Sequence, residues 1–98
     1  MEVEYKNSKI EKICTYASVA EKKYGLRMAE LISLRIDQIR AADSVEQMIK
    51  YKIGRCHQLE GNRKSQYAVD LVHPKRLVFE KKGKEINIVN ILEIVDYH

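Results

Sequence analysis

An apolar run near the C-terminal end of the sequence constrains the fold most strongly. Over residues 86–95 the apolar side chains come in adjacent pairs: Ile88/Val89, Ile91/Leu92 and Ile94/Val95. A strand with apolar side chains on both faces is buried within a sheet, so we expect a central strand here. The run leads directly into Asp96, Tyr97 and His98, three titratable residues that we expect at the rim of that sheet.

The composition indicates one soluble globular domain over residues 1–98. Hydrophobic residues make up 45% and charged residues 33% of 98, and no apolar run approaches the roughly 20 residues that a membrane span needs. The acidic N-terminal residues do not read as a signal peptide, so we expect a cytoplasmic protein. Cys14 and Cys56 are too few for a disulfide framework and lack metal-ligand spacing, which predicts buried thiols.

The first half of the sequence has mainly helical periodicity. After a short alternating strand at 2–6, the spacing Ser8 to Glu11 predicts a capping box for a helix that runs to Tyr24 and ends at Gly25. A second helix is expected over 26–42, with its apolar positions at Met28, Ala29, Ile32, Ile36 and Ile39. A short helical turn is expected after Ser44.

Beyond residue 51 the apolar residues recur at every second position, which is the spacing of a strand. Four strands are predicted, at Arg55–Leu59, Gln66–Val72, Arg76–Glu80 and Ile86–Val95, and the turns between them contain Gly or Pro. Short connections favour antiparallel neighbours. The expected fold class is therefore α+β: a small, mostly antiparallel sheet of the first strand and four C-terminal strands, covered on one face by two N-terminal helices. Tyr51 and Tyr67 are expected to be half-buried aromatic residues.

The positive charge is concentrated in two stretches of the second half. Residues 50–64 and residues 73–84 each contain five Lys or Arg against one acid, whereas residues 1–49 are balanced. Such stretches are suited to a polyanion, although a solvated lysine surface explains them equally well. The candidate RNA or phosphate contacts are Lys50, Lys52, Arg55, Arg63, Lys64, Lys75, Lys81, Lys82 and Lys84.

The period of two also assigns side chains to faces of the sheet. It places Arg55 and His57 on one face, directs Arg76 away from the helices, and puts Asp96 on the same face as His98. We therefore expect a cleft formed by His57, Arg76, Asp96 and His98, which Tyr97 joins only if the last residues leave the sheet. A hydrogen-bonded structural histidine and a frayed polar strand end are the alternatives. His57 and His98 lack a third ligand at metal spacing, so neither a metal nor another cofactor is expected.

Four short motifs resemble the HigB branch of the RelE/ParE toxin superfamily. In order along this sequence they are HQLEGNRK at 57–64, YAV at 67–69, RLVF at 76–79 and DYH at 96–98. The sequence departs from the family pattern at Glu60, where the family often has a basic residue. It also has His73-Pro74-Lys75 in place of the usual turn before the arginine strand.

The resemblance implies a ribosome-dependent endoribonuclease that cuts messenger RNA and is neutralised by a helix-turn-helix antitoxin of the HigA type, in a complex of two toxins and two antitoxins. It places His57, Arg76, Asp96, Tyr97 and His98 at the family's functional positions. We expect the RNA 2′-hydroxyl to attack the adjacent phosphorus without a metal, leaving a 2′,3′-cyclic phosphate. This reaction needs a base, an acid and cations beside the phosphate.

In the expected mechanism His98 is the base, oriented by Asp96, and His57 is the acid or second proton carrier. The sequence does not distinguish these two roles, which can be exchanged. Arg76, helped by Arg63 or Lys64, stabilises the transition state, while Tyr97 positions the ribose. Two other classes of function stay open: a ParE-like inhibitor of DNA gyrase with the same fold but no nuclease chemistry, and a non-catalytic module that binds an antitoxin as co-repressor.

Overall fold

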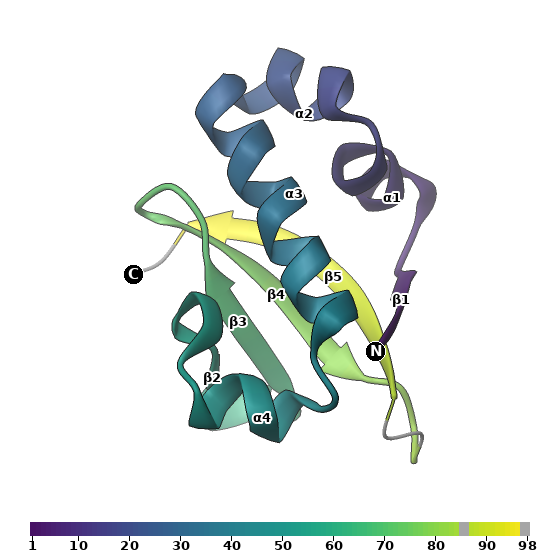
Figure 1. Cartoon of the computed structure of the whole chain (residues 1–98), viewed down its shortest axis with the longest axis vertical. Coiled ribbons are helices and arrows are strands. Elements are labelled where there is room, and N and C mark those ends of the chain that lie inside the picture. Colours follow the sequence, from purple (N-terminus) through teal and green to yellow (C-terminus); the bar gives the residue numbers. More distant parts are fainter. Residues whose placement is uncertain (85–86, 97–98) are drawn as a thin grey trace.

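The computed structural model describes residues 1–84 and 87–96, which form a five-stranded sheet with helices packed on one face (Figure 1). The elements in chain order are β1 (Glu2–Tyr5), α1 (Ser8–Thr15), α2 (Ala17–Tyr24), α3 (Leu26–Ala41), α4 (Val45–Lys50), β2 (His57–Gln58), β3 (Gln66–Asp70), β4 (Lys75–Lys81) and β5 (Ile88–Asp96). Single 3-10 turns lie at Ile53–Arg55 and Gly61–Arg63. The predicted α+β class is confirmed.

The strands lie in the order β1-β5-β4-β3-β2. The three pairs formed by β2 to β5 are antiparallel, as their short connections predict. In contrast, β1 is parallel to β5, from which four helices and three strands separate it in sequence. β5 lies between β1 and β4, so the apolar run is an internal strand but not the central one that the sequence predicted. The middle position of the sheet belongs to β4.

The core lies between α3 and the sheet. The five apolar residues predicted to line the second helix are all buried, and they pack against Val69, Leu77, Phe79, Val89 and Ile91 from three strands. The ring of Phe79 is fully buried and stacks on Tyr67, with 5.9 Å between the ring centroids. The crossing of α3 over the strands is visible in Figure 1. The face of the sheet that points away from α3 is called the outer face below.

The first predicted helix is two helices. Tyr16 adopts an extended conformation (φ −109°, ψ 109°) that ends α1 and precedes α2. Thr15 and Tyr16 have low helix propensity, which explains why the interruption falls here. The cap of α1 was also predicted one residue late, because the side chain of Asn7, rather than Ser8, accepts a hydrogen bond from the Ile10 amide. At α4, Ser44 is the cap, as predicted.

A β-bulge in β5 changes the faces on which its last residues lie. Phe79 pairs with Ile91 while the neighbouring Val78 pairs with Glu93, so Leu92 is the extra residue. An extra residue reverses the alternation of side chains from that point onward. Ile94 therefore faces the core, and Asp96 lies on the same face as the helices.

The two cysteines are free thiols. Cys56 is buried and Cys14 is half-buried, and burial raises the pKa of each thiol to about 12. The prediction of buried thiols is thus correct for Cys56 and partly correct for Cys14. Within the described ranges 1–84 and 87–96, no helix has the length and apolar character required to cross a bilayer.

Candidate functional site

His57 and Arg76 meet on the outer face of the sheet. His57 lies in β2 opposite Ala68 of β3, and Arg76 lies in β4. The Nε2 atom of His57 is 3.2 Å from a terminal nitrogen of Arg76, and its Nδ1 atom is 3.0 Å from the Arg55 carbonyl oxygen. A guanidinium can only donate, so Nε2 accepts and Nδ1 donates. Nε2 of His57 is thus directed at Arg76, and Nδ1 is directed at the Arg55 carbonyl.

Three arginines surround Asp70 at the end of β3. Its carboxylate oxygens lie 3.3 Å from Nε of Arg55 and 3.7 Å from Nε of Arg76, while its main-chain carbonyl accepts a 2.6 Å hydrogen bond from Nε of Arg35. We call Arg35, Arg55, His57, Asp70 and Arg76 the Asp70 cluster. Apart from His57, three guanidinium groups against one carboxylate give the cluster a net charge of +2.

The cluster adjoins a cavity of about 170 Å³ at the turn between β3 and β4. Arg55, Asp70, His73, Lys75 and Arg76 are among the residues that line it. A water molecule occupies roughly 30 Å³ of liquid, so the cavity has room for several waters or for a phosphate group. Burial lowers the pKa of Arg35, and the Asp70 carboxylate partly offsets this effect. The cavity therefore combines positive charge with guanidinium donors, a combination that suits a phosphate.

The backbone before His57 turns sharply to build this site. Lys52, Gly54 and Arg55 have φ values of 54°, 58° and 55°, in the left-handed region. Two of these residues are not glycine, which costs on the order of 1 kcal/mol or more each. The turn directs the Arg55 carbonyl toward His57 and its side chain toward Asp70. The predicted strand at 55–59 is consequently wrong at its start, because only His57 and Gln58 are in the sheet.

Gly54 is needed at this turn for a second reason. A Cβ atom added at Gly54 would lie 2.9 Å from Nε of Arg35, whereas one added at Gly61 (φ 67°) would meet nothing within 4 Å. We expect Gly54→Ala to lower the free energy of unfolding by about 2–3 kcal/mol, and Gly61→Ala by about 1 kcal/mol from backbone strain alone. Urea unfolding of the two variants measures the difference. If the two variants lost the same free energy of unfolding, the result would contradict the close contact between Gly54 and Arg35.

Asp96 lies on the helical face of the sheet, whereas the sequence predicted it on the face of His57 and Arg76. Its partner across the sheet is Lys75, and its carboxylate lies 2.6 Å from the Lys75 ammonium group. That ammonium group is also 5.7 Å from the ring centre of Tyr24 in α2, which identifies this face as the helical one. The reason is the bulge at Leu92, which reverses the faces of all later residues of β5. The other two residues of the predicted tail, Tyr97 and His98, lie outside the described residues.

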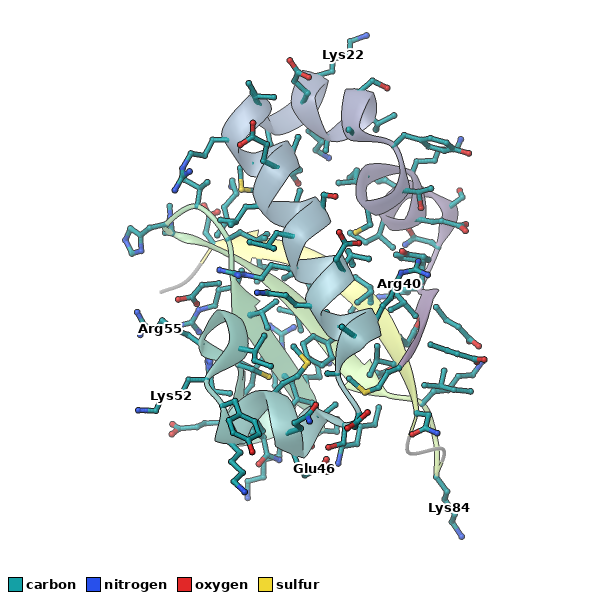
Figure 2. All side chains as sticks on the ribbon, viewed as in Figure 1. Lys22, Arg40, Glu46, Lys52, Arg55 and Lys84 are labelled. Carbon is teal, nitrogen blue, oxygen red and sulfur yellow. The ribbon has the colours of Figure 1, made fainter. Side chains whose placement is uncertain are left out.

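The nine predicted phosphate contacts are divided between different parts of the molecule. Arg55 and Lys75 line the cavity beside Arg76. Lys52 and Arg55 point outward from one side, whereas Lys84 is at the far end of the molecule (Figure 2). Lys81 and Lys82 form ion pairs with Glu46 and Glu4 respectively, and the Lys81 ammonium group also lies over the Tyr67 ring on the helical face.

The other three basic residues have local contacts of their own. The Arg63 guanidinium is 2.7 Å from the Glu93 carboxylate and 2.7 Å from the Gln66 side-chain oxygen, on the outer face. The exposed Lys64 accepts a hydrogen bond at its main-chain carbonyl from Gln58. Lys50 lies over the ring of Tyr51, which is 64% exposed rather than half-buried as predicted.

Sequence reasoning missed Arg35 and Asp70. Arg35 belongs to a helix whose polar residues read as a solvated face, and Asp70 reads as an ordinary polar residue of a strand. Only the packing of α3 against the end of β3 brings them together. In the described part of the chain, no three His, Cys, Asp or Glu side chains are placed to share a metal ion. The described candidate site consists of three arginines, one aspartate and one imidazole beside a cavity.

Two solved structures share the fold of this protein. A YoeB/ParE toxin from Agrobacterium tumefaciens matches with a TM-score of 0.66 and 13% sequence identity, over 100% of both chains. A YoeB–YefM complex from Staphylococcus aureus matches with a TM-score of 0.64 and 18% identity, over 100% of this chain and 97% of that chain. No protein-family model and no curated protein matches the sequence. At these identities the comparisons establish a shared fold, as the RelE/ParE resemblance predicted.

Proposed function

We propose that this protein is the toxin of a toxin–antitoxin pair and cuts messenger RNA on the ribosome, as the HigB branch of the RelE/ParE superfamily does. The observation that carries the proposal is the Asp70 cluster, which places the imidazole of His57 against a guanidinium beside a cationic cavity. The shared fold supports it, since both matching structures contain YoeB-type toxins and one of them is a complex with YefM. The proposed partner is a HigA-like helix-turn-helix antitoxin, in a complex of two toxins and two antitoxins.

In the proposed reaction the RNA 2′-hydroxyl attacks the neighbouring phosphorus. The products are a 2′,3′-cyclic phosphate and a free 5′-hydroxyl. Arg76 donates hydrogen bonds to the phosphate oxygens, where negative charge increases in the transition state. Arg55 extends the positive charge along the cavity, and Lys50, Lys52, Arg63 and Lys64 contact the flanking RNA backbone by charge.

The hydrogen bond between Arg76 and His57 favours His57 as the base. Its Nε2 lone pair accepts from Arg76 in the structure. When a phosphate draws the Arg76 guanidinium away, the same lone pair becomes available for the proton of the 2′-hydroxyl. His98 then protonates the departing 5′-oxygen. This assignment exchanges the two roles first expected, an exchange that the sequence left open.

The C-terminal residues complete the proposed site. Tyr97 positions the ribose and His98 carries the second proton, as the resemblance implies. Asp96 has a different proposed role from the one first expected, because its carboxylate bonds to Lys75 on the helical face. We propose that this ion pair fixes the end of β5, the strand that leads into Tyr97 and His98.

Expression in growing bacteria separates the proposed nuclease from the alternatives. We expect the wild-type protein to arrest growth and cut messages within minutes, and His98→Ala to do neither because one proton carrier is lost. Lys84→Ala is the matched control and should remain toxic. Intact messages with DNA damage would instead indicate a gyrase inhibitor, and undisturbed growth with the wild-type protein would indicate a binding module. Either result contradicts the proposal.

A further inference from the structure

Tyr51 is the most exposed large apolar side chain among the described residues, with 64% of its surface open to solvent. It is the residue that ends α4, and its amide donates a hydrogen bond to the Gln47 carbonyl. The Lys50 ammonium group lies 5.5 Å from the centre of the Tyr51 ring, and Lys52 is the next residue along the chain. An exposed aromatic ring between two lysines combines a flat apolar face with positive charge, the two elements of a platform for a nucleobase.

The platform is close to the Asp70 cluster. Tyr51 is four residues from Arg55, so their Cα atoms are at most about 14 Å apart. Hydrogen bonds from the Lys52 amide to the Ile49 carbonyl and from the Arg55 amide to the Lys52 carbonyl close the intervening turns. Arg55 lines the cationic cavity, and Lys52 and Arg55 project from the same side of the molecule (Figure 2). A short extension of an RNA strand from the cavity therefore meets Tyr51.

The charges of this segment are available for phosphates. Residues 50–55 contain three cations and no acid. Arg55 pairs with Asp70, whereas among residues 1–84 and 87–96 no ion pair includes Lys50 or Lys52. Lys52 and Arg55 are also the only described residues other than glycine with a positive φ. Such strain is concentrated at binding sites, and here it belongs to the turn that carries the two cations on one side of the molecule.

We propose that Tyr51 stacks on one nucleobase of the RNA strand that enters the cavity of the Asp70 cluster, while Lys50 and Lys52 bind the phosphates on either side of that base. The inference rests on the proposed function, because it extends the path of the RNA beyond the site of cleavage. Stacking uses the face of a base and not its edges, so the platform accepts all four bases. It therefore contributes affinity and fixes the position of the strand without reading its sequence.

A protein partner is the other class of ligand that an exposed tyrosine serves. Tyrosine is enriched at protein–protein interfaces, but lysine is depleted there. The order of lysine, tyrosine and lysine at 50–52, with Arg55 beyond, therefore favours RNA. If a protein covered Tyr51 instead, Tyr51→Ala would leave the affinity for RNA unchanged, and the proposal would be wrong.

Fluorescence titration of the full-length protein into a 2′-O-methyl octauridylate tests the stacking. The 2′-O-methyl groups prevent cleavage, and each inner base is replaced in turn by 2-aminopurine, whose fluorescence falls when it stacks on an aromatic ring. We expect quenching that is strongest at one position, and about tenfold weaker binding without this quenching for Tyr51→Ala. Tyr51→Phe keeps the ring and should bind within twofold of wild type. Absence of binding by the wild-type protein, or equal quenching by Tyr51→Ala, would overturn the proposal.

A matched control and an abasic nucleotide separate stacking from an indirect effect on the fold. Tyr16 is 57% exposed but has Thr15 and Ala17 as neighbours, so Tyr16→Ala should bind as the wild type does. An abasic nucleotide at the most quenched position should weaken wild-type binding about tenfold and leave the affinity of Tyr51→Ala unchanged, because the stack is already lost. If the two losses multiplied, the ring and the base would act independently, which contradicts the proposal.

The salt dependence of binding tests the two lysines. Each phosphate contact on a single strand contributes about 0.7 to the slope of log affinity against log salt, so Lys50→Gln/Lys52→Gln should lower the slope by about 1.4. Lys22→Gln, at the other end of the molecule in Figure 2, should not change it. An unchanged slope for the double variant would exclude the lysines from the contact.

Cleavage of ribosome-bound message is a separate readout. Quenching that depends on Tyr51, in a protein that cuts no message, would refute the proposed function and leave the stacking platform standing. Cleavage by a protein whose Tyr51→Ala variant keeps full affinity for the octanucleotide would do the reverse.

Discussion

Replacing Arg76 with alanine is expected to slow cleavage of ribosome-bound messenger RNA by about 10²–10³-fold, the usual effect of removing one donor to a charged transition state. Arg76 is placed for this role by two contacts, with Nε2 of His57 and with the Asp70 carboxylate. Its side chain is only 14% exposed, so the guanidinium is held in a defined geometry beside the cavity. The alanine variant loses the phosphate donor and the group that orients His57 at the same time.

The measurement is a single-turnover cleavage rate on programmed ribosomes, with thermal unfolding as a check that the variant folds. Arg76→Lys keeps the charge but not the planar pair of donors, so we expect it to recover only part of the rate. Arg40→Ala is the matched control, because Arg40 lies on the side of the molecule away from Arg55 in Figure 2 and should retain full activity. A rate for Arg76→Ala within threefold of wild type would exclude Arg76 from the chemistry.

Phe79→Ala is expected to lower the free energy of unfolding by about 3–5 kcal/mol, which is a large part of the 5–15 kcal/mol that stabilises a typical domain. The ring of Phe79 has no exposed surface and stacks on Tyr67 beneath α3. It belongs to β4, the middle strand, which also contains Arg76. Its loss therefore leaves a cavity directly under the strand that positions the site.

Urea unfolding followed by circular dichroism measures this loss. Phe79→Leu keeps much of the buried apolar volume, so its free energy of unfolding should fall clearly less than that of the alanine variant. Tyr16→Ala removes an aromatic ring that is 57% exposed. We expect it to change the free energy of unfolding by about 0.5 kcal/mol or less. If Phe79→Ala lowered the free energy of unfolding by less than about 1 kcal/mol, the core would not be centred on β4.

The elements with the clearest periodicity were the most predictable from the sequence. All five apolar positions predicted for the second helix are buried in α3, because a regular stripe at helical spacing specifies one face. The glycine at 25 ends α2 with φ 93°, as predicted. The strands β3, β4 and β5 lie close to their expected positions because Gly or Pro turns separate their apolar runs. The parallel pairing of β1 with β5 has no local signal, since it depends on how the helices return the chain to the sheet.

The site was less predictable because two local departures from regular geometry determine it. The bulge at Leu92 moves Asp96 to the helical face, and no sequence pattern indicates it in a segment that is apolar on both sides. The left-handed conformation of Arg55 is equally hidden, since arginine rarely adopts it. The expected proximity of His57 and Arg76 is confirmed, because the face of each strand was assigned correctly. Arg35 and Asp70 were missed because only tertiary packing brings them to the same place.

End-group analysis of RNA cut by the purified protein on programmed ribosomes tests the central claim most directly. The proposed attack by the 2′-hydroxyl predicts a 2′,3′-cyclic phosphate on the upstream fragment and a 5′-hydroxyl on the downstream fragment. It also predicts that a message with a single 2′-deoxy substitution at the cleavage site stays intact. Cleavage of the deoxy-substituted message, or fragments with a 3′-hydroxyl and a 5′-phosphate, would contradict the chemistry proposed for His57 and Arg76.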